Sequence, residues 1–360
     1  MAGGRGERFW PQSRLATPKH LLPIVGDKSM LAQTVERVVG VVPRENIFVL
    51  TTQAQLDGCR RACPDLPEDN IVAEPMGRDT AAATGLALLL VKQRSPLATF
   101  AMLPADHVIH DVAEYQALLK VAFDSAESAD VLVTLGIRPT GPETGFGYIQ
   151  QAGPCKEVAG HSVYAVKRFV EKPDRTTAQS YLLHNDLHKE SRYLWNAGMF
   201  VWRVAMVEAA FKLHAPELYA GLTKLEQAAQ SAGGWTAALA QLYPSLPKIS
   251  VDYALMEKST NVVVVPATFD WDDVGAWPAI AKHFDQDGWG NVLRGAAIVE
   301  DGQANIIVSD DDHLTAVVGL SDLIVVHTPE ATLVCHKDKA QEIKALLKRL
   351  ADDPAKRKFL

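Results

Sequence analysis

Short apolar runs alternate with helical patterns through the first two hundred residues, and this alternation constrains the fold more than any other feature. The runs 46–51, 98–103 and 131–135 have the length of buried strands, whereas 81–91 and 115–126 have the length of helices. Regular β/α alternation predicts an α/β fold in which helices cover both faces of a mixed, mostly parallel sheet. Ligands of such sheets bind at the carboxyl ends of the strands.

The second part of the chain has a different pattern. A long helical region is expected from about 204 to 242, and the apolar run 262–265 returns the chain to the sheet. Five short strand-like runs then follow at nearly regular spacing, namely 296–299, 305–308, 314–318, 323–326 and 332–335. This spacing predicts a small coiled or sandwich-like β-domain, closed by a helix at about 339–350. We therefore expect a large α/β domain at 1–285 and a C-terminal β-domain at 286–360.

Charge and cysteine usage exclude several classes of protein. The formal net charge is -7 at pH 7, so no broad basic field is present to hold a nucleic-acid backbone. An anionic ligand must instead meet a local cluster of donors, which favours a small phosphorylated molecule. The 4 cysteines are too scattered for a disulfide framework, and no apolar run reaches the roughly 18 residues that a membrane span needs. We expect a cytoplasmic protein without nucleic-acid or membrane partners.

A glycine loop at residues 3–11 carries the strongest functional signal. Its glycines are Gly3, Gly4 and Gly6. Clustered glycines let backbone N–H groups approach phosphate oxygens without a Cβ in the way, and Arg8 and Lys19 can supply fixed positive charge. The loop is neither a Walker A motif nor a dinucleotide fingerprint. Taken alone, it is also compatible with a glycine turn beside a solvated arginine.

The glycine loop begins unusually close to Met1. A phosphate loop normally follows a buried strand, and the residues before Gly3 are too few to form one. Either the sheet lacks a central strand, or the true start of the protein lies upstream of Met1. We expect the upstream start.

Two neighbouring segments indicate a family. Residues 3–11 and Pro18–Leu22 resemble the opening motif of the sugar-nucleotide pyrophosphorylases, and Phe9-Trp10-Pro11 resembles its mannose-1-phosphate guanylyltransferase (GDP-mannose pyrophosphorylase) branch. Further motifs match in the expected order as far as about residue 277. The resemblance implies a Rossmann-like nucleotidyltransferase domain with a small tail like a left-handed β-helix, and without the fused isomerase of some relatives. The implied reaction transfers GMP from GTP to mannose 1-phosphate and releases pyrophosphate.

Four positions match the catalytic residues of this family. Asp106 follows a predicted strand, and a hard carboxylate at that place suits Mg²⁺, which takes few protein ligands. In isolation, an aspartate after a strand is more often a cap or turn residue. The resemblance implies that Asp106 and Asp273 bind Mg²⁺. It also implies that Arg8 and Lys19 bind the triphosphate and stabilise charge at its α-phosphorus.

The remaining matches concern the two substrates. Beside the three glycines, the implied nucleotide-binding residues are Glu74, Arg78, Asp79 and Thr80. The implied sugar-phosphate-binding residues are Gly147, Tyr148, Glu171, Lys172 and Asn196, with Asp252 and Glu257 in support. A carboxylate can accept hydrogen bonds from guanine N1–H and N2–H, but spacing does not identify the residue that recognises the base. Helix capping by Asp79 or Thr80, and a solvated strand edge for Glu171 and Lys172, are the structural alternatives.

Two other functions stay open at this point. One is an enzyme of the same fold with a different sugar or base, and the other is a non-catalytic regulatory paralogue that binds a sugar nucleotide. The paralogue is expected to have lost the loop arginine or the metal carboxylates, whereas this chain has Arg8, Lys19, Asp106 and Asp273. Exposed strand edges in the β-domain favour a homodimer.

Overall fold

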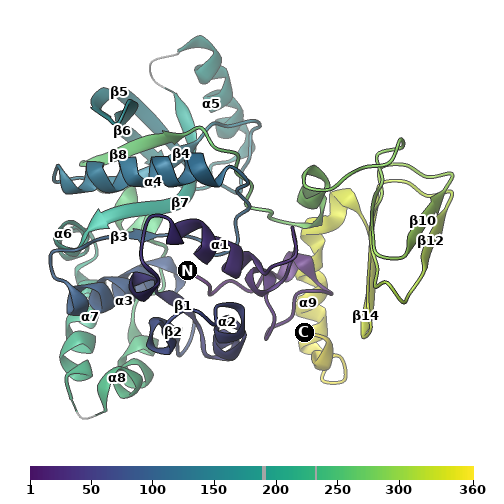
Figure 1. Ribbon diagram of the computed structural model, residues 1–360, viewed down its shortest axis with the longest axis horizontal. Helices are drawn as coiled ribbons and strands as arrows, with labels where there is room; N and C mark the ends of the chain where they lie inside the picture. Colours follow the sequence, from purple (N-terminus) through teal and green to yellow (C-terminus); the bar gives the residue numbers. More distant parts are fainter. Residues whose placement is uncertain (189–191, 232) are drawn as a thin grey trace.

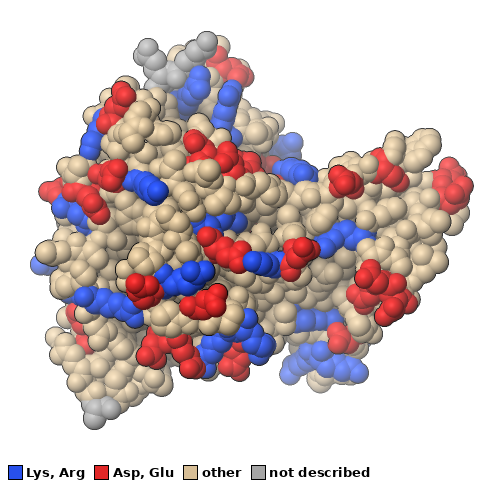
Figure 2. Space-filling view, viewed as in Figure 1, with Lys and Arg blue, Asp and Glu red and all other residues tan. Residues whose placement is uncertain are grey.

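The computed structural model describes residues 1–188, 192–231 and 233–360. Figure 1 shows a large α/β part and a smaller β-rich part, with the C-terminal helix α9 (Ile343–Asp352) between them. Within the described ranges, none of the helices combines the length and the apolar character needed to span a membrane. On the face shown in Figure 2, basic and acidic side chains are interspersed over the α/β part.

A 6-stranded sheet in the order β3-β7-β4-β8-β6-β5 forms the centre of the α/β part. Its strands are β3 (Thr99–Met102), β4 (Leu132–Ile137), β5 (Tyr148–Val158), β6 (His161–Val170), β7 (Tyr193–Arg203) and β8 (Val262–Ala267). The α/β class and the mixed sheet are confirmed. The expectation of a mostly parallel sheet is wrong, because among the described strands of this sheet β4 and β8 alone pair in parallel.

Two local features cause this difference. β5 and β6 form an antiparallel hairpin whose turn residues, Ala159 and Gly160, both have positive φ, as tight hairpin turns require. β7 also runs antiparallel to its three partners β3, β4 and β5. The pattern of apolar runs does not reveal strand direction, and it therefore does not predict the hairpin.

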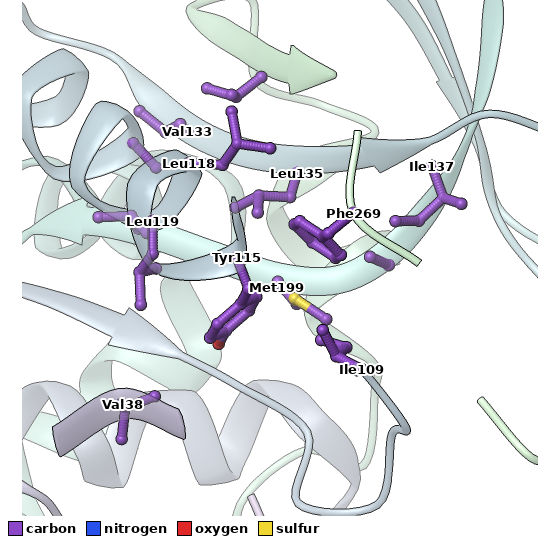
Figure 3. Packing of buried hydrophobic residues seen from close by; sticks show 14 of the residues in the cluster. Val38, Ile109, Tyr115, Leu118, Leu119, Val133, Leu135, Ile137, Met199 and Phe269 are labelled. Carbon is purple, nitrogen blue, oxygen red and sulfur yellow. The ribbon is translucent and has the colours of Figure 1, made fainter. Parts of the chain in front are cut away.

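Helices cover both faces of the sheet, as the sequence predicts. One face packs against α1 (Met30–Val39), α4 (Val112–Glu127) and α5 (Arg175–Leu187). Figure 3 shows part of this core, where Leu118 and Leu119 of α4 lie near Val133 and Leu135 of β4. The other face packs against α3 (Asp79–Arg94), α6 (Val204–His214), α7 (Pro216–Ala229) and α8 (Gly234–Leu242). The last three form the helical region expected at 204–242.

A separate parallel pair, β1 (Val49–Thr52) and β2 (Ile71–Glu74), lies beside the large sheet with α2 (Leu56–Ala62) packed against it. A mainly apolar cavity of about 420 Å³, lined by residues of both β1 and β3, separates the pair from the sheet.

Met1 and Ala2 lie beside this cavity and form backbone hydrogen bonds with the segments on both sides of it. The Ala2 N–H donates to Leu50 O at 2.7 Å, the Met1 amino group donates to Leu103 O at 2.8 Å, and the Ala105 N–H donates to Met1 O at 3.0 Å. These bonds place the two residues in the register of a parallel strand between β1 and β3. A sheet without a central strand and a start of the protein upstream of Met1 are both compatible with this gap, and the upstream start stays a prediction.

The C-terminal part is a coil of short strands. β9 (Val292–Arg294), β11 (Ile306–Val308) and β13 (Leu323–Thr328) pair in parallel, and β10 (Ala297–Glu300) pairs in parallel with β12 (Thr315–Val318). β11 therefore stacks on β9, β13 on β11, and β12 on β10. β14 (Ala331–His336) pairs antiparallel with β13 at the end of the sheet. The five predicted runs correspond to β10–β14, and the closing helix is preceded by a 3-10 segment, Lys337–Glu342.

Candidate functional site

Most of the predicted site residues meet in a cavity of about 450 Å³. They come from segments far apart in sequence, including the glycine loop, the ends of β2 and β6, and the segments that follow β3 and β8. The predicted residues that line the cavity are Gly3, Gly4, Glu74, Arg78, Asp79, Thr80, Asp106, Gly147, Glu171, Lys172, Asn196 and Asp273. Gly6, Arg8, Lys19 and Tyr148 lie outside its lining.

Lys19 connects the two predicted metal-binding segments. Its side chain is only 6% exposed, and its ammonium donates to Asp106 O at 2.8 Å, to Asp106 Oδ2 at 3.1 Å and to Asp273 O. An ammonium has three donors, and these bonds use all of them. Lys19 therefore joins the Asp106 and Asp273 segments, and its contact with the triphosphate stays a prediction.

The glycine loop packs tightly against this lysine. Gly6 has a φ of 60°, and a Cβ there would lie 2.4 Å from Lys19 Cβ and 2.6 Å from its backbone nitrogen. Only a residue without a side chain fits this left-handed turn. Gly6 thus shapes the loop, while Gly3 and Gly4 line the cavity.

The two aspartates carry opposite pKa shifts. Burial acts to raise the pKa of Asp106, but the charges of Lys19 and His107 and the hydrogen bond from Lys19 lower it to about 2. Burial raises the pKa of Asp273, and the nearby Asp272 and Asp106 charges add to this rise against the opposing charge of Lys19. Both carboxylates line the cavity, and a hard divalent cation such as Mg²⁺ would suit them because it would relieve the repulsion that raises the pKa of Asp273. Among the described residues, no group of three His, Cys, Asp or Glu side chains could hold a metal alone.

Glu74 and the start of α3 form one part of the cavity wall. Glu74 is buried, its Oε1 accepts a hydrogen bond from the Tyr243 hydroxyl, and its Oε2 faces Gly3. Burial raises the pKa of Glu74 against this hydrogen bond. Thr80 does not cap the helix with its hydroxyl, because Thr80 Oγ1 accepts from the Val251 N–H at 2.8 Å. Tyr243 was not predicted, since a tyrosine in a helical region gives no signal of a distant partner.

The Arg78 and Asp79 side chains are held locally in the same part of the wall. The Arg78 guanidinium donates to Pro244 O, and Asp79 Oδ1 accepts from the Thr80 N–H at 2.8 Å. Asp79 has a φ of 63° and is exposed at the cavity. The structure thus leaves the Asp79 carboxylate exposed at the cavity.

Gly147 and Glu171 are in close contact in another part of the cavity wall. A Cβ on Gly147 would lie 2.5 Å from Glu171 Oε2, so an added methyl group would displace the Glu171 carboxylate. The Glu171 N–H donates to Glu257 Oε1 at 2.9 Å, and Glu171 Oε1 accepts from the Lys172 ammonium. Glu171 Oε2 is buried without a hydrogen-bond partner. A buried unpaired carboxylate oxygen in a cavity wall is suited to accept from a ligand hydroxyl.

Asn196 is fixed beside them by its own partners. Its Nδ2 donates to Asp252 Oδ1 at 2.9 Å, and its Oδ1 accepts from the Gly198 N–H at 3.1 Å. Burial and the nearby Glu171 charge raise the pKa of Asp252 to about 6. Asp252 and Glu257 thus contact Asn196 and Glu171, and their supporting roles stay a prediction.

Tyr148 is the predicted sugar-binding residue that the structure places elsewhere. Its side chain is fully buried in the core, where its ring lies 5.3 Å from that of Tyr181. Its neighbour Phe146 does line the cavity together with Trp271, with ring centroids 5.2 Å apart. Residue alternation accounts for the position of Tyr148, because Gly147 lines the cavity and the next side chain along the strand start points to the opposite face. The sequence contained both aromatic residues within matched motifs, but nothing in the motifs indicated this orientation.

A second cleft, of about 960 Å³, adjoins the cavity and shares Phe146, Trp271 and Asp273 with it. Arg8 lies here, not in the main cavity, and Gln341 of the C-terminal part lines the same cleft. Arg8 Nη1 would lie 3.5 Å from a Cβ on Gly275, in the turn that carries Asp273. The predicted triphosphate arginine is thus next to the aspartate pair.

Comparisons with known proteins agree with this geometry. Residues 1–288 match the family model described as nucleotidyl transferase, and residues 295–350 match that of the MannoseP isomerase/GMP-like beta-helix domain. Xanthan biosynthesis protein XanB of Xanthomonas campestris pv. campestris (strain B100) is 37% identical, over 97% of this chain and 72% of its own length. A mannose-1-phosphate guanylyltransferase of Escherichia coli is 35% identical, over 96% of this chain and 71% of its own length.

A solved structure resembles the whole molecule. The crystal structure described as mannose-1-phosphate geranyltransferase from Thermus thermophilus has a TM-score of 0.84 and 35% identity, and the match covers 98% of both chains. The resemblance seen in the sequence motifs is therefore confirmed. On these matches, the chain belongs to the nucleotidyl transferase family, and it combines that catalytic fold with a C-terminal β-helix-like domain.

Proposed function

We propose that this chain transfers GMP from GTP to mannose 1-phosphate and yields GDP-mannose and pyrophosphate. The observation that carries the proposal is one cavity lined by two groups of polar residues, the first around Glu74 and the start of α3 and the second around Gly147 and Glu171. The Asp106 and Asp273 segments, joined by Lys19, also line it. The name of the E. coli relative supports the choice of substrates.

The reaction needs no protein nucleophile. An oxygen of the sugar phosphate attacks the α-phosphorus of GTP, a new P–O bond forms, and the bond from this phosphorus to the oxygen bridging to the β-phosphate breaks. Pyrophosphate leaves with that electron pair. The C–O bond at the sugar carbon is never broken, so its configuration is retained. Catalysis then consists of holding two anionic substrates in line and stabilising charge at phosphorus.

Each group of residues has a part in this scheme. Asp106 and Asp273 would hold Mg²⁺, which when bound neutralises phosphate charge. Lys19 keeps both aspartates in place, and Arg8 offers a guanidinium to the triphosphate. Glu171 Oε2 would accept from a sugar hydroxyl, and the half-exposed Lys172 would meet the sugar phosphate.

Pyrophosphate release by the purified protein tests the proposal. The assay supplies Mg²⁺ and mannose 1-phosphate with GTP, ATP, UTP or dTTP, and a second series supplies glucose 1-phosphate with GTP. We expect release with GTP and mannose 1-phosphate only, and its loss with EDTA or in Asp273→Asn. Release only with another nucleotide, or only with glucose 1-phosphate, would indicate an enzyme of the same fold with a different specificity. Binding of GDP-mannose without any release would instead favour the non-catalytic regulatory function.

We also propose a homodimer and a cytoplasmic location. Support for the homodimer comes from large apolar side chains exposed on the C-terminal part, namely Leu293, Ile298, Leu314, Val318, Leu320 and Val334. These side chains would give a second copy of the chain an apolar surface to cover. Light scattering behind size-exclusion chromatography would measure the mass in solution, and cell fractionation would test the location.

A further inference from the structure

We propose that the C-terminal domain positions the glycine loop at residues 3–11, and that Gln341 of that domain holds the Arg8 guanidinium in the orientation that binds the triphosphate. The inference rests on the proposed function, because it assigns Arg8 to the triphosphate. It adds a positioning residue that lies outside the nucleotidyl transferase domain.

The loop and the C-terminal domain share one hydrophobic core. Phe9 and Trp10 of the loop belong to the same buried cluster as Val292, Ile306 and Ile343 of the C-terminal domain. Phe9 is fully buried, and its ring centroid lies 5.0 Å from that of Trp277. The two residues directly after Arg8 are therefore anchored in a core that the nucleotidyl transferase domain does not complete alone.

Hydrogen bonds fix the exit of the loop to the same domain. The Trp10 indole N–H donates to Phe359 O at 2.8 Å, and Arg14 donates to the same carbonyl oxygen. Arg14 also pairs with Glu330, 3.3 Å away. On the other side, the Trp277 indole N–H donates to Trp10 O at 3.1 Å. These bonds restrict both the backbone and the side chains of the segment that follows Arg8.

Gln341 extends this support to the charged group itself. Arg8 Nη1 donates to Gln341 Oε1 at 3.4 Å, a long bond, and both residues line the cleft next to Asp273. A neutral amide restrains a guanidinium without cancelling its charge, whereas a carboxylate at this place would compete with phosphate for the arginine. An arginine held before the substrate arrives loses less side-chain entropy on binding. Gln341 therefore strengthens triphosphate binding through Arg8 and not by contact of its own.

Nucleotide binding by Gln341 variants tests this role. We expect Gln341→Ala to weaken GTP binding about fivefold, as measured by isothermal titration calorimetry without sugar phosphate. Gln341→Glu should weaken it further, because the new carboxylate pairs with Arg8. The affinity for mannose 1-phosphate and the melting temperature should stay as in the wild type. The matched control is Glu342→Gln, an exposed neighbour on the same turn, which should bind GTP normally.

A double-mutant cycle separates action through Arg8 from a general structural effect. In an Arg8→Ala background, Gln341→Ala should cause no further loss, whereas equal losses in both backgrounds would overturn the proposal. The cycle uses whichever of GTP, ATP, UTP and dTTP the wild type binds most tightly. It therefore reports on Gln341 even if turnover shows that the proposed substrates are wrong. Turnover as proposed with an additive cycle would overturn only the role of Gln341, and binding of none of the four nucleotides would overturn both.

Discussion

The contact between Gly147 and Glu171 predicts a strong effect from a single methyl group. In Gly147→Ala, the new Cβ would lie 2.5 Å from Glu171 Oε2 and 3.3 Å from Asn196 Cβ. Glu171 cannot turn away freely, because Glu257 and Lys172 hold its backbone and its other oxygen. We expect the KM for mannose 1-phosphate to rise about tenfold, which corresponds to about 1.4 kcal/mol of lost binding. Steady-state kinetics with each substrate varied in turn measures it.

Gly145→Ala is the matched control for this change. Gly145 lies two residues away in the same loop, and a Cβ there would meet nothing within 4 Å. This variant should keep the wild-type KM for both substrates. An unchanged KM for mannose 1-phosphate in Gly147→Ala, or an equal rise in both variants, would contradict the assignment of this part of the cavity to the sugar.

At the scale of elements, the apolar pattern predicted the positions of the strands in the chain better than their directions in the sheet. The runs at 98–103, 131–135 and 262–265 became β3, β4 and β8 because strands buried on both faces are apolar along their length. The direction of β6 is set by the two-residue turn Ala159-Gly160, and that of β7 by its pairing with distant strands; the apolar runs report neither. The same limit applies to the site. Motifs located Lys19, but its three hydrogen bonds to Asp106 and Asp273 arise only when the segments after β3 and β8 meet.

The cavity between β1 and β3 predicts that an added strand would stabilise the fold. Burial lowers the pKa of the Met1 amino group to about 6, whereas a peptide N–H in its place would donate to Leu103 O without a buried charge. We expect a Val-Ile-Val-Ile-Val extension ahead of Met1 to pair with both open edges and fill the apolar cavity. A net gain of about 2 kcal/mol would raise the melting temperature by about 2–3 °C.

A Gly-Ser-Gly-Ser-Gly extension of equal length controls for the mere addition of residues. It supplies the same backbone donors but no apolar side chains, and it loses more entropy on ordering. Differential scanning calorimetry compares both proteins with the unextended chain. Equal melting temperatures for the two extensions would show that the cavity does not accept a strand.

At the scale of the whole molecule, two domains of different architecture share one hydrophobic cluster. Phe9, Trp10 and Trp277 of the nucleotidyl transferase part share one buried cluster with the strands of the coil and with Ile343 of α9. Figure 1 shows α9 where the two parts meet. Separating them would expose some of the largest fully buried side chains, Phe9 and Trp277 among them. Domains joined only by a polar contact would not face this cost.

This shared core predicts that the two domains unfold together. A single transition is expected in calorimetry, and it should coincide with the transition seen by tryptophan fluorescence, because Trp10 and Trp277 lie in the shared cluster. Ile343→Ala should lower the stability of the whole molecule by about 3 kcal/mol, since it opens a cavity in that cluster. It should do so without splitting the transition. A separate transition of the C-terminal coil that leaves the fluorescence of Trp10 and Trp277 unchanged would show that the coil is an independent unit. Its support of the glycine loop would then depend on the polar contacts alone.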